Sequence, residues 1–213
     1  LVNYGFIFGE VIRRVTGMQV EEYLHRAFLQ PMGLTDTWMR LPAKMLGSTP
    51  RLETRYPVMQ TARRLFSIPS IRTARLPAAS LHSSACDLAA VFQMLLEDGA
   101  WQGKRLLQPE TVRFATSSGY FGWDEYIHHP MHWGYGFILG RLDGQTEEDV
   151  ALGRRSSSQT FSAMGMGTNM VWADRPSGTV VAFTCNGMLP NRQAAERWSE
   201  ISNAVWDWLD AMG

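Results

Sequence analysis

The residue types that most often carry out chemistry in proteins are scattered along this chain. Three of its five histidines lie close together, at His128, His129 and His132, in a segment rich in aromatic residues and proline. This spacing allows a metal site, but ordinary loop histidines explain it too, and we favour that second interpretation. The two cysteines, Cys86 and Cys185, match no metal-ligand spacing and are expected to be buried apolar thiols. We therefore expect no metal ion and no cofactor.

The run of small residues at positions 161–168 is the other segment that suggests a site. It reads Phe-Ser-Ala-Met-Gly-Met-Gly-Thr. A glycine inside a strand allows another backbone or a ligand to approach closely, and Gly165 is placed to do so. Taken by itself, however, this run is better explained as a strand of small residues packed against helices.

Length and composition indicate a folded globular protein. A chain of 213 residues suffices for one large domain or two small ones. Its 45% apolar and 19% charged residues argue against disorder, and its zero net charge argues against a nucleic-acid partner. No apolar run reaches the ~20 residues of a membrane span. The chain starts at Leu1 rather than at a methionine, so we expect a missing N-terminal portion, where any targeting signal would lie.

Helical spacing dominates the first part of the chain. Residues 41–75 carry four prolines and predict a long irregular excursion, of a kind that often shapes a functional cleft. The aromatic segment 120–133 is expected to be a second loop of this kind. Serines 83 and 84 are placed to cap the clearest helix, which Gly99 closes. Helices are predicted over residues 5–15, 20–28, about 59–65, about 84–98 and from residue 109.

The last third of the chain changes to short strands. Strands are predicted over residues 135–142, 168–173 and 179–185, the last two joined by a turn into an antiparallel hairpin. Helices followed by strands indicate an α+β fold, with a mainly helical region at 1–134 and strands plus a closing helix at 135–213. The closing helix begins near Asn191 and carries an apolar stripe expected to pack on the sheet, formed by Ala194, Trp198, Ile201, Val205, Trp208 and Met212.

Several sequence patterns follow one another in the order in which one known family carries them. They are the segments 5–12, 15–17, 22–24, 31–37, 77–89, 103–112, 133–137, 168–174 and 180–186. The ordered set resembles the β-lactamase-related serine hydrolases, which include class C β-lactamases, penicillin-binding proteins, D-aminopeptidases and family VIII esterases. The resemblance implies a β-lactamase/transpeptidase-like fold, an antiparallel sheet flanked by helices, whose N-terminal part would precede this chain.

The same resemblance implies acyl transfer, in which a serine attacks a carbonyl, forms an acyl-enzyme and is released by water. In this family the serine belongs to a Ser-x-x-Lys motif at the start of a helix, with the lysine one turn away. No such motif is present, and its expected place is upstream of Leu1. The serines at 156–158 have no lysine at the right offset and are interpreted as a flexible polar loop.

The family's second element, Tyr-x-Asn, lies just before its first helix here and has two possible registers. Alignment on Asn3 puts Leu1 at the tyrosine position. Alignment on Gly9, which we prefer, puts Val2 at the asparagine position and the tyrosine before residue 1. Either way the tyrosine is absent, and Asn3 is a substrate contact or, as we favour, a helix cap.

The third element is a strand that reads Lys or His, any residue, then glycine. Ala163, Met164 and Gly165 occupy these three positions as candidate substrate contacts, so the polar first residue is missing. The backbone N–H of Met166 corresponds to the family's oxyanion donor, a role that does not depend on side-chain identity. A carboxylate substrate requires a cationic partner, so an uncharged residue at 163 favours a neutral ester over a β-lactam.

These patterns together predict a portion of a serine hydrolase that cleaves an ester or amide, with an esterase favoured over a β-lactamase. Its partners would be a small-molecule ester, amide or peptide substrate and the N-terminal portion of the same fold. The chain alone lacks Ser-x-x-Lys and is expected to be inactive. The alternative is a degenerate, non-catalytic member of the family that binds a ligand in the same cleft.

Overall fold

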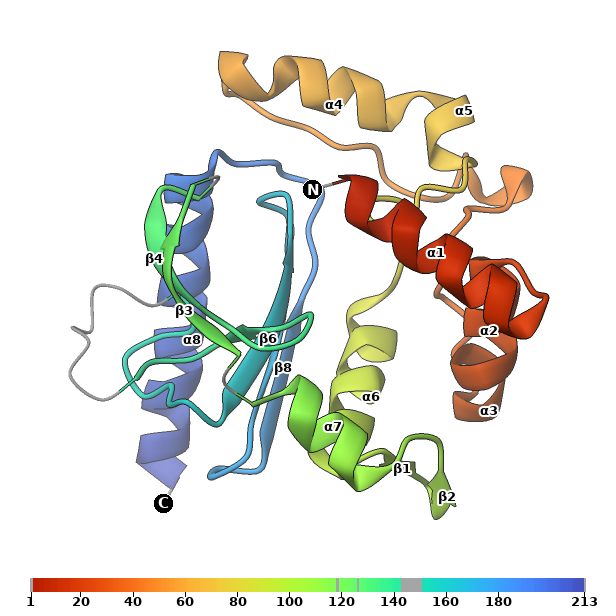
Figure 1. The fold of residues 1–213 in the computed structure, drawn as a ribbon. Coiled ribbons are helices and arrows are strands. Elements are labelled where there is room, and N and C mark those ends of the chain that lie inside the picture. Colours follow the sequence, from red (N-terminus) through yellow and green to blue (C-terminus); the bar gives the residue numbers. More distant parts are fainter. Residues whose placement is uncertain (1, 118, 126, 143–150, 213) are drawn as a thin grey trace. The chain divides into compact units, whose positions relative to one another are not determined.

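The structure is a computed structural model that describes residues 2–117, 119–125, 127–142 and 151–212 (Figure 1). The chain forms two compact units that divide between Ala90 and Val91. This boundary differs from the expected one after residue 134. Residues 91–134, which include helices as well as the strand pair within 120–133, lie in the second unit.

In the first unit, the two predicted N-terminal helices are confirmed. The first, α1 (Val2–Thr16), ends at Gly17, whose φ of +73° suits a residue without a side chain. The second, predicted over 20–28, is longer, because α2 (Val20–Leu24) continues through a π-helical turn (His25–Leu29) into α3 (Gln30–Met32). Gly33, with a φ of +71°, ends this helix.

The long excursion of the first unit is held together by a buried arginine. Arg72 is only 5% exposed. Its Nη2 donates hydrogen bonds to the carbonyl oxygens of Thr49 at 3.0 Å and Pro50 at 3.3 Å, and its Nη1 to that of Leu46 at 3.4 Å. A buried charge needs such partners, so Arg72 fixes the path of an otherwise irregular segment. The elements here are two 3-10 helices (Ala43–Met45 and Pro57–Met59), α4 (Gln60–Ser67), close to the predicted helix at 59–65, and α5 (Pro69–Arg72).

A capped helix links the two units. The predicted serine cap of α6 (Ala85–Leu96) is confirmed, since Ser84 Oγ accepts a hydrogen bond from the Asp87 N–H at 3.1 Å. The buried Asp87 carboxylate accepts hydrogen bonds from Thr37 Oγ1 at 2.7 Å and the Asp36 N–H at 2.9 Å. These bonds attach the start of α6 to the turn that follows α3.

The second unit contains a six-stranded antiparallel sheet with the order β3-β4-β5-β6-β7-β8. Each strand pairs with its neighbour in the sequence, so the sheet is a simple meander. The predicted hairpin is confirmed as β7 and β8. The strands are β3 (Tyr120–Asp124), β4 (His129–Trp133), β5 (Ile138–Leu139), β6 (Thr160–Gly165), β7 (Asn169–Asp174) and β8 (Thr179–Phe183); before them come β1 (Ala100–Trp101), β2 (Lys104–Arg105) and α7 (Pro109–Ala115).

Two expectations for this sheet are wrong. The segment 120–133 is a hairpin at the sheet edge rather than a loop, although Pro130 lies within it, opposite Trp123. Proline usually argues against a strand because it lacks an N–H, but it is tolerated near sheet edges. The strand predicted over 135–142 shortens to Ile138–Leu139, because a tight turn precedes it. There the Gly134 N–H bonds to the Phe137 carbonyl oxygen at 2.8 Å, and Gly136 has a φ of +94°.

The C-terminal helix α8 (Asn191–Met212) covers one face of this sheet, as Figure 1 shows in blue. Its buried residues follow a spacing of four: Ala194, Trp198, Ser202 and Trp206. Trp206 stacks on Trp172 of β7 at 4.8 Å between ring centroids, and the Trp172 indole N–H bonds to Ser202 Oγ at 3.1 Å.

The predicted stripe of α8 is therefore correct from Ala194 to Val205 and wrong at its last two positions. Trp208 and Met212 are exposed, and Trp206 takes the buried position. Rows of residues four apart run obliquely to the helix axis, so a helix packed along such a row turns the later positions of the predicted stripe toward water.

The two cysteines are less buried than expected. Neither cysteine is fully buried: Cys86 is exposed in the first turn of α6, and Cys185 is half-buried, with its thiol donating to the Thr168 carbonyl oxygen at 3.2 Å. The expectation of two buried thiols is thus wrong, because Cys86 lies on the outer side of its helix.

Within the described ranges, no helix has the length and apolar character needed to cross a membrane.

The role of Arg72 predicts that Arg72→Met loosens the excursion. Three backbone carbonyls would lose their charged donor, and the free energy of unfolding should fall by about 2 kcal/mol. Urea unfolding and the rate of proteolytic cleavage within residues 41–75 measure the effect. The matched control is Arg64→Met, at an exposed position of α4. Equal cleavage rates in the two variants would contradict this role.

The corrected stripe predicts that two neighbouring tryptophans of α8 differ sharply. Trp206→Ala should lower the free energy of unfolding by about 3–5 kcal/mol, since it empties a buried site beside Trp172. Trp208→Ala should change it by no more than about 0.5 kcal/mol, since that ring is 59% exposed. Thermal or urea unfolding of both variants measures these changes. If Trp208→Ala lowered the free energy of unfolding more than Trp206→Ala, the stripe predicted from the sequence would be correct instead.

Candidate functional site

Strand β6 carries most of the candidate residues, and it is paired differently along its two sides. Toward β7 it is paired over its whole length, from Thr160 opposite Asp174 to Gly165 opposite Asn169. Toward β5 it is paired only at Phe161 and Ser162. Among the described residues, positions 163–165 therefore have no neighbouring strand on that side. An extended ligand can bind to such an open edge through main-chain hydrogen bonds.

Alternation along β6 separates the two candidate side chains at its centre. Phe161 and Ala163 lie on the same face, where the Phe161 ring stacks on Phe92 of α6 at 5.7 Å between centroids. Met164 lies on the opposite face and packs against the core formed with α8. Ala163 is exposed. Thus position 163 offers its small side chain to a ligand, whereas the Met164 side chain is engaged in the core and only its backbone is available.

Gly165 is not required by the packing of the fold. A Cβ built on it would have Nδ2 of Asn169 as its nearest neighbour, at 3.5 Å, which is ordinary van der Waals contact. Its φ also lies outside the left-handed region that favours glycine. By contrast, a Cβ on Gly167 would come within 2.2 Å of the Leu189 carbonyl oxygen. The space in front of Gly165 is therefore open, as close approach of a ligand would need.

Met166 lies in the turn between β6 and β7, in an uncommon backbone conformation. The Thr168 N–H bonds to the Gly165 carbonyl oxygen at 2.7 Å, and φ is +30° at Met166 and +68° at Gly167. Two successive positive φ values are typical of a type I′ turn, and the first one falls here on a residue with a side chain. No acceptor among the described residues bonds to the Met166 N–H. This donor is therefore available to a bound oxygen atom.

Arg197 of α8 holds this turn in place. Its Nη2 donates to the Gly167 carbonyl oxygen, its Nη1 donates to that of Gly187 at 3.2 Å, and its guanidinium lies 5.6 Å from the Phe183 ring centroid. The sequence does not reveal this role. The only signal is a charged residue directly beside the buried Trp198, on the inner side of an amphipathic helix.

Asn3 is the one candidate outside the second unit. It is exposed and lies inside α1, directly after the first residue of that helix. A capping residue precedes the first residue of its helix, so the structure does not give Asn3 the capping position that we favoured. Within the second unit, the structure brings together the candidates at residues 163–166.

His129 and His132 both contact backbone carbonyl groups. Over the parts of the chain that the structure describes, no three His, Cys, Asp or Glu side chains are close enough to hold a metal ion. His132 is buried, and its Nδ1 contacts the Gly140 carbonyl oxygen at 3.0 Å; His129 Nδ1 contacts that of Pro130 at 2.8 Å. These contacts fit histidines that stabilise the hairpin and its neighbours.

The arrangement around β6 can bind a ligand but offers no group for covalent chemistry. Residues 163–166 carry no titratable or nucleophilic side chain. What they provide is an open strand edge, an exposed small side chain and an available N–H. These are the features of a surface that orients a carbonyl and stabilises negative charge on its oxygen.

Comparison with solved structures identifies the fold. A penicillin-binding protein homologue from Caulobacter crescentus matches with a TM-score of 0.74 at 24% identity, over 97% of this chain and 57% of that one. A family VIII carboxylesterase matches with a TM-score of 0.67 at 22% identity, over 94% and 57%. A mutant simvastatin synthase from Aspergillus terreus matches with a TM-score of 0.71 at 20% identity, over 95% and 53%.

The chain thus spans little more than half the length of the solved structures that it resembles. A comparison with curated proteins gives no match. The structural matches confirm the expected β-lactamase/transpeptidase-like architecture, an antiparallel sheet with helices. The family model described as Beta-lactamase matches residues 2–205, almost the entire chain. On this evidence the chain belongs to the beta-lactamase family.

Proposed function

We propose that the whole protein carrying this chain is a serine hydrolase that cleaves a neutral ester or amide through an acyl-enzyme. The observation that carries this proposal is the available N–H of Met166 at the end of an open strand edge. In acyl transfer, negative charge develops on the carbonyl oxygen, and a fixed backbone donor stabilises it. One such donor is typically worth about 10²–10³ in rate.

In the proposed mechanism, the substrate lies along the edge of β6 beside Ala163 and Gly165. Its scissile carbonyl oxygen accepts the Met166 N–H, and the second donor and the nucleophilic serine come from a Ser-x-x-Lys helix. The serine hydroxyl attacks the carbonyl carbon while a base takes its proton. The alcohol or amine then leaves, and water releases the acyl group. Asn3 is proposed as a further substrate contact.

The exposed Ala163 supports an ester rather than a carboxylate-bearing substrate. A carboxylate group binds well where an arginine or lysine can pair with it. Residues 163–166 include no cation, so this stretch of the edge offers no compensation for a desolvated carboxylate. A short neutral acyl ester has no such requirement.

The same residue also favours a second candidate, a non-catalytic protein that binds a ligand along β6. An open edge and an N–H donor can bind a peptide or partner without any chemistry. The two candidate functions differ in whether they need catalytic residues that this chain does not contain. A Ser-x-x-Lys motif in the rest of the protein is required by the first candidate and unnecessary for the second.

The proposed activity predicts that the whole protein hydrolyses a short-chain nitrophenyl ester faster than it hydrolyses nitrocefin, a β-lactam. One serine should react with a fluorophosphonate probe, and that labelling should abolish turnover. A folded protein with neither turnover nor labelling would rule out the hydrolase. Saturable ligand binding by such an inactive protein would then establish the binding candidate.

A second prediction tests the role of Gly165 within this mechanism. Gly165→Ala should leave the melting temperature unchanged, because its Cβ meets no atom closer than 3.5 Å. It should lower kcat/KM for the ester by about 10- to 100-fold, because a displacement of about 1 Å at the reacting centre costs this much. The matched control is Gly47→Ala, at an exposed position of the first unit where an added Cβ meets no atom within 4 Å. Equal activity of the two variants would show that ligands do not lie against Gly165.

A further inference from the structure

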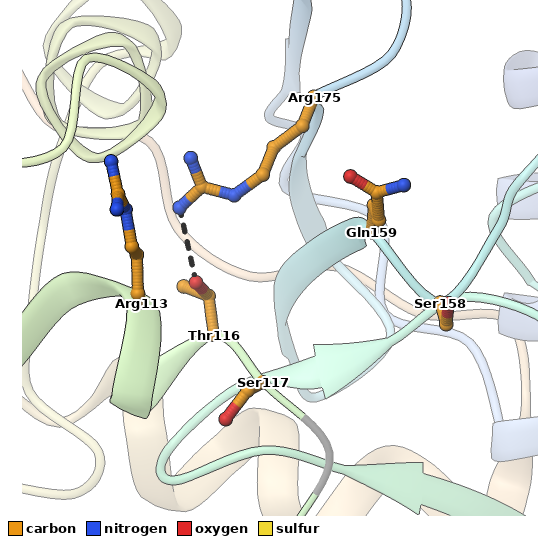
Figure 2. Close-up of a pocket in the computed structure, with 6 residues that line it drawn as sticks. All are labelled: Arg113, Thr116, Ser117, Ser158, Gln159 and Arg175. Carbon is orange, nitrogen blue, oxygen red and sulfur yellow. Dashed lines mark hydrogen bonds between the residues drawn. The ribbon is translucent and has the colours of Figure 1, made fainter. Parts of the chain in front are cut away.

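A polar hollow lies in the second unit, at the end of β6 opposite Met166 (Figure 2). It has a volume of about 300 Å³, at the lower limit of small-molecule sites. Gln159 directly precedes β6 and Met166 directly follows it, so the two ends are roughly 20 Å apart along an extended strand. The hollow is therefore separate from the site around Met166. Its lining residues are Arg113, Thr116, Ser117, Ser158, Gln159 and Arg175.

The two arginines of this hollow share one carboxylate. Arg113, at the end of α7, donates from Nε and Nη2 to Oδ2 of Asp98 at 3.0 and 2.7 Å. Arg175, in the turn after β7, donates from Nη1 to Oδ1 of the same carboxylate at 2.9 Å. The Arg113 bonds, followed by the charge of Arg175, lower the pKa of Asp98 from its ordinary value. Asp98 thus stays ionised at neutral pH, and the three groups together carry one surplus positive charge.

Arg175 is held rigidly before any ligand arrives. Its Nη2 donates to Thr116 Oγ1 at 3.2 Å, the bond drawn in Figure 2. Its guanidinium also lies 5.4 Å from the ring centroid of Phe161, within cation–π range. The Arg175 side chain is only 23% exposed. A guanidinium fixed in this way loses little conformational entropy when it binds a ligand.

Several hydrogen-bond donors of the hollow are still available. Nη1 of Arg113 and Nε of Arg175 bond to no acceptor that the structure describes. The same holds, within the described residues, for the Ser158 hydroxyl and the Gln159 side-chain amide, whereas the Gln159 backbone N–H donates to Ser157 Oγ at 3.2 Å. Figure 2 shows Arg113 on one side of the hollow and Gln159 and Ser158 on the other. The segment around Ser158, expected to be a flexible polar loop, is an ordered turn, with Ser156 buried and bonded to the Gly153 carbonyl oxygen at 2.8 Å.

We propose that this hollow is a binding site for a small oxyanion, the phosphate or carboxylate group of a ligand. Side chains that donate hydrogen bonds line it from α7, from the turn after β7 and from the segment before β6, and its only charged lining residues are the two arginines. Phosphate and carboxylate oxygens are the acceptors that arginine pairs recognise best. An ion-pair network that only stabilised the fold would not require Nε of Arg175, on a side chain only 23% exposed, to lack an acceptor among the described residues. The site is independent of the proposed hydrolase activity.

The test is a titration of the whole protein with inorganic phosphate, and separately with acetate, at constant ionic strength set by sodium chloride. Calorimetry and the shift in melting temperature report binding, since a ligand of the folded state raises that temperature. Saturable binding of phosphate assigns a phosphate group to the site, and saturable binding of acetate assigns a carboxylate. If neither anion binds more than chloride does, the proposal is wrong.

Three variants localise the binding. Arg113→Gln, whose side chain is 69% exposed and so suited to replacement, should weaken it about tenfold or more through loss of a charged donor. Gln159→Leu should weaken it severalfold without changing the charge. Arg192→Gln is the control, because it removes one positive charge from an exposed pair with Glu196 outside the hollow. Equal weakening by Arg113→Gln and Arg192→Gln would show non-specific attraction and overturn the site.

Discussion

The pairing of β6 with β7 sets the position of everything that makes the second unit a candidate site. Because side chains alternate along a strand, this register places Met164 in the core under α8 and Ala163 on the open face. A slip of one residue would exchange these faces, exposing Met164 and turning Ala163 into the core. The buried side chains of β7, including Met170 and Trp172, make such a slip costly.

Side-chain hydrogen bonds fix both ends of the β6–β7 strand pair. At one end, Asp174 accepts hydrogen bonds from Thr160 Oγ1 at 2.6 Å and from Ser177 Oγ at 2.7 Å. At the other end, Arg197 holds the turn that contains Met166. The strand pair is thus fixed from the hollow beside Gln159 to the turn that contains Met166, and a rigid scaffold is what a preorganised donor requires.

The sequence predicted the features that depend on local periodicity and turn chemistry. The helices, the serine cap of α6 and the β7–β8 hairpin all follow from spacing and from turn residues close in sequence. The sequence-based predictions failed where contacts between residues distant in sequence determine the structure. Pro130 concealed the β3–β4 hairpin, and the oblique packing of α8 replaced Trp208 by Trp206. The roles of Arg72 and Arg197 depend on carbonyl groups distant in sequence, which no periodic pattern contains.

The candidate site on β6 has no polar side chain at position 163, where the family motif carries one. What β6 presents, an open edge and the Met166 N–H, is made of backbone groups, and backbone groups survive substitution at position 163. Their geometry depends instead on neighbours such as Arg197 and on the close approach of Gly167 to Leu189. Substitutions at those neighbours should therefore disturb the site more than most changes at position 163. A cation introduced there would mainly change which substrate fits, because it adds a partner for a carboxylate without moving the donor.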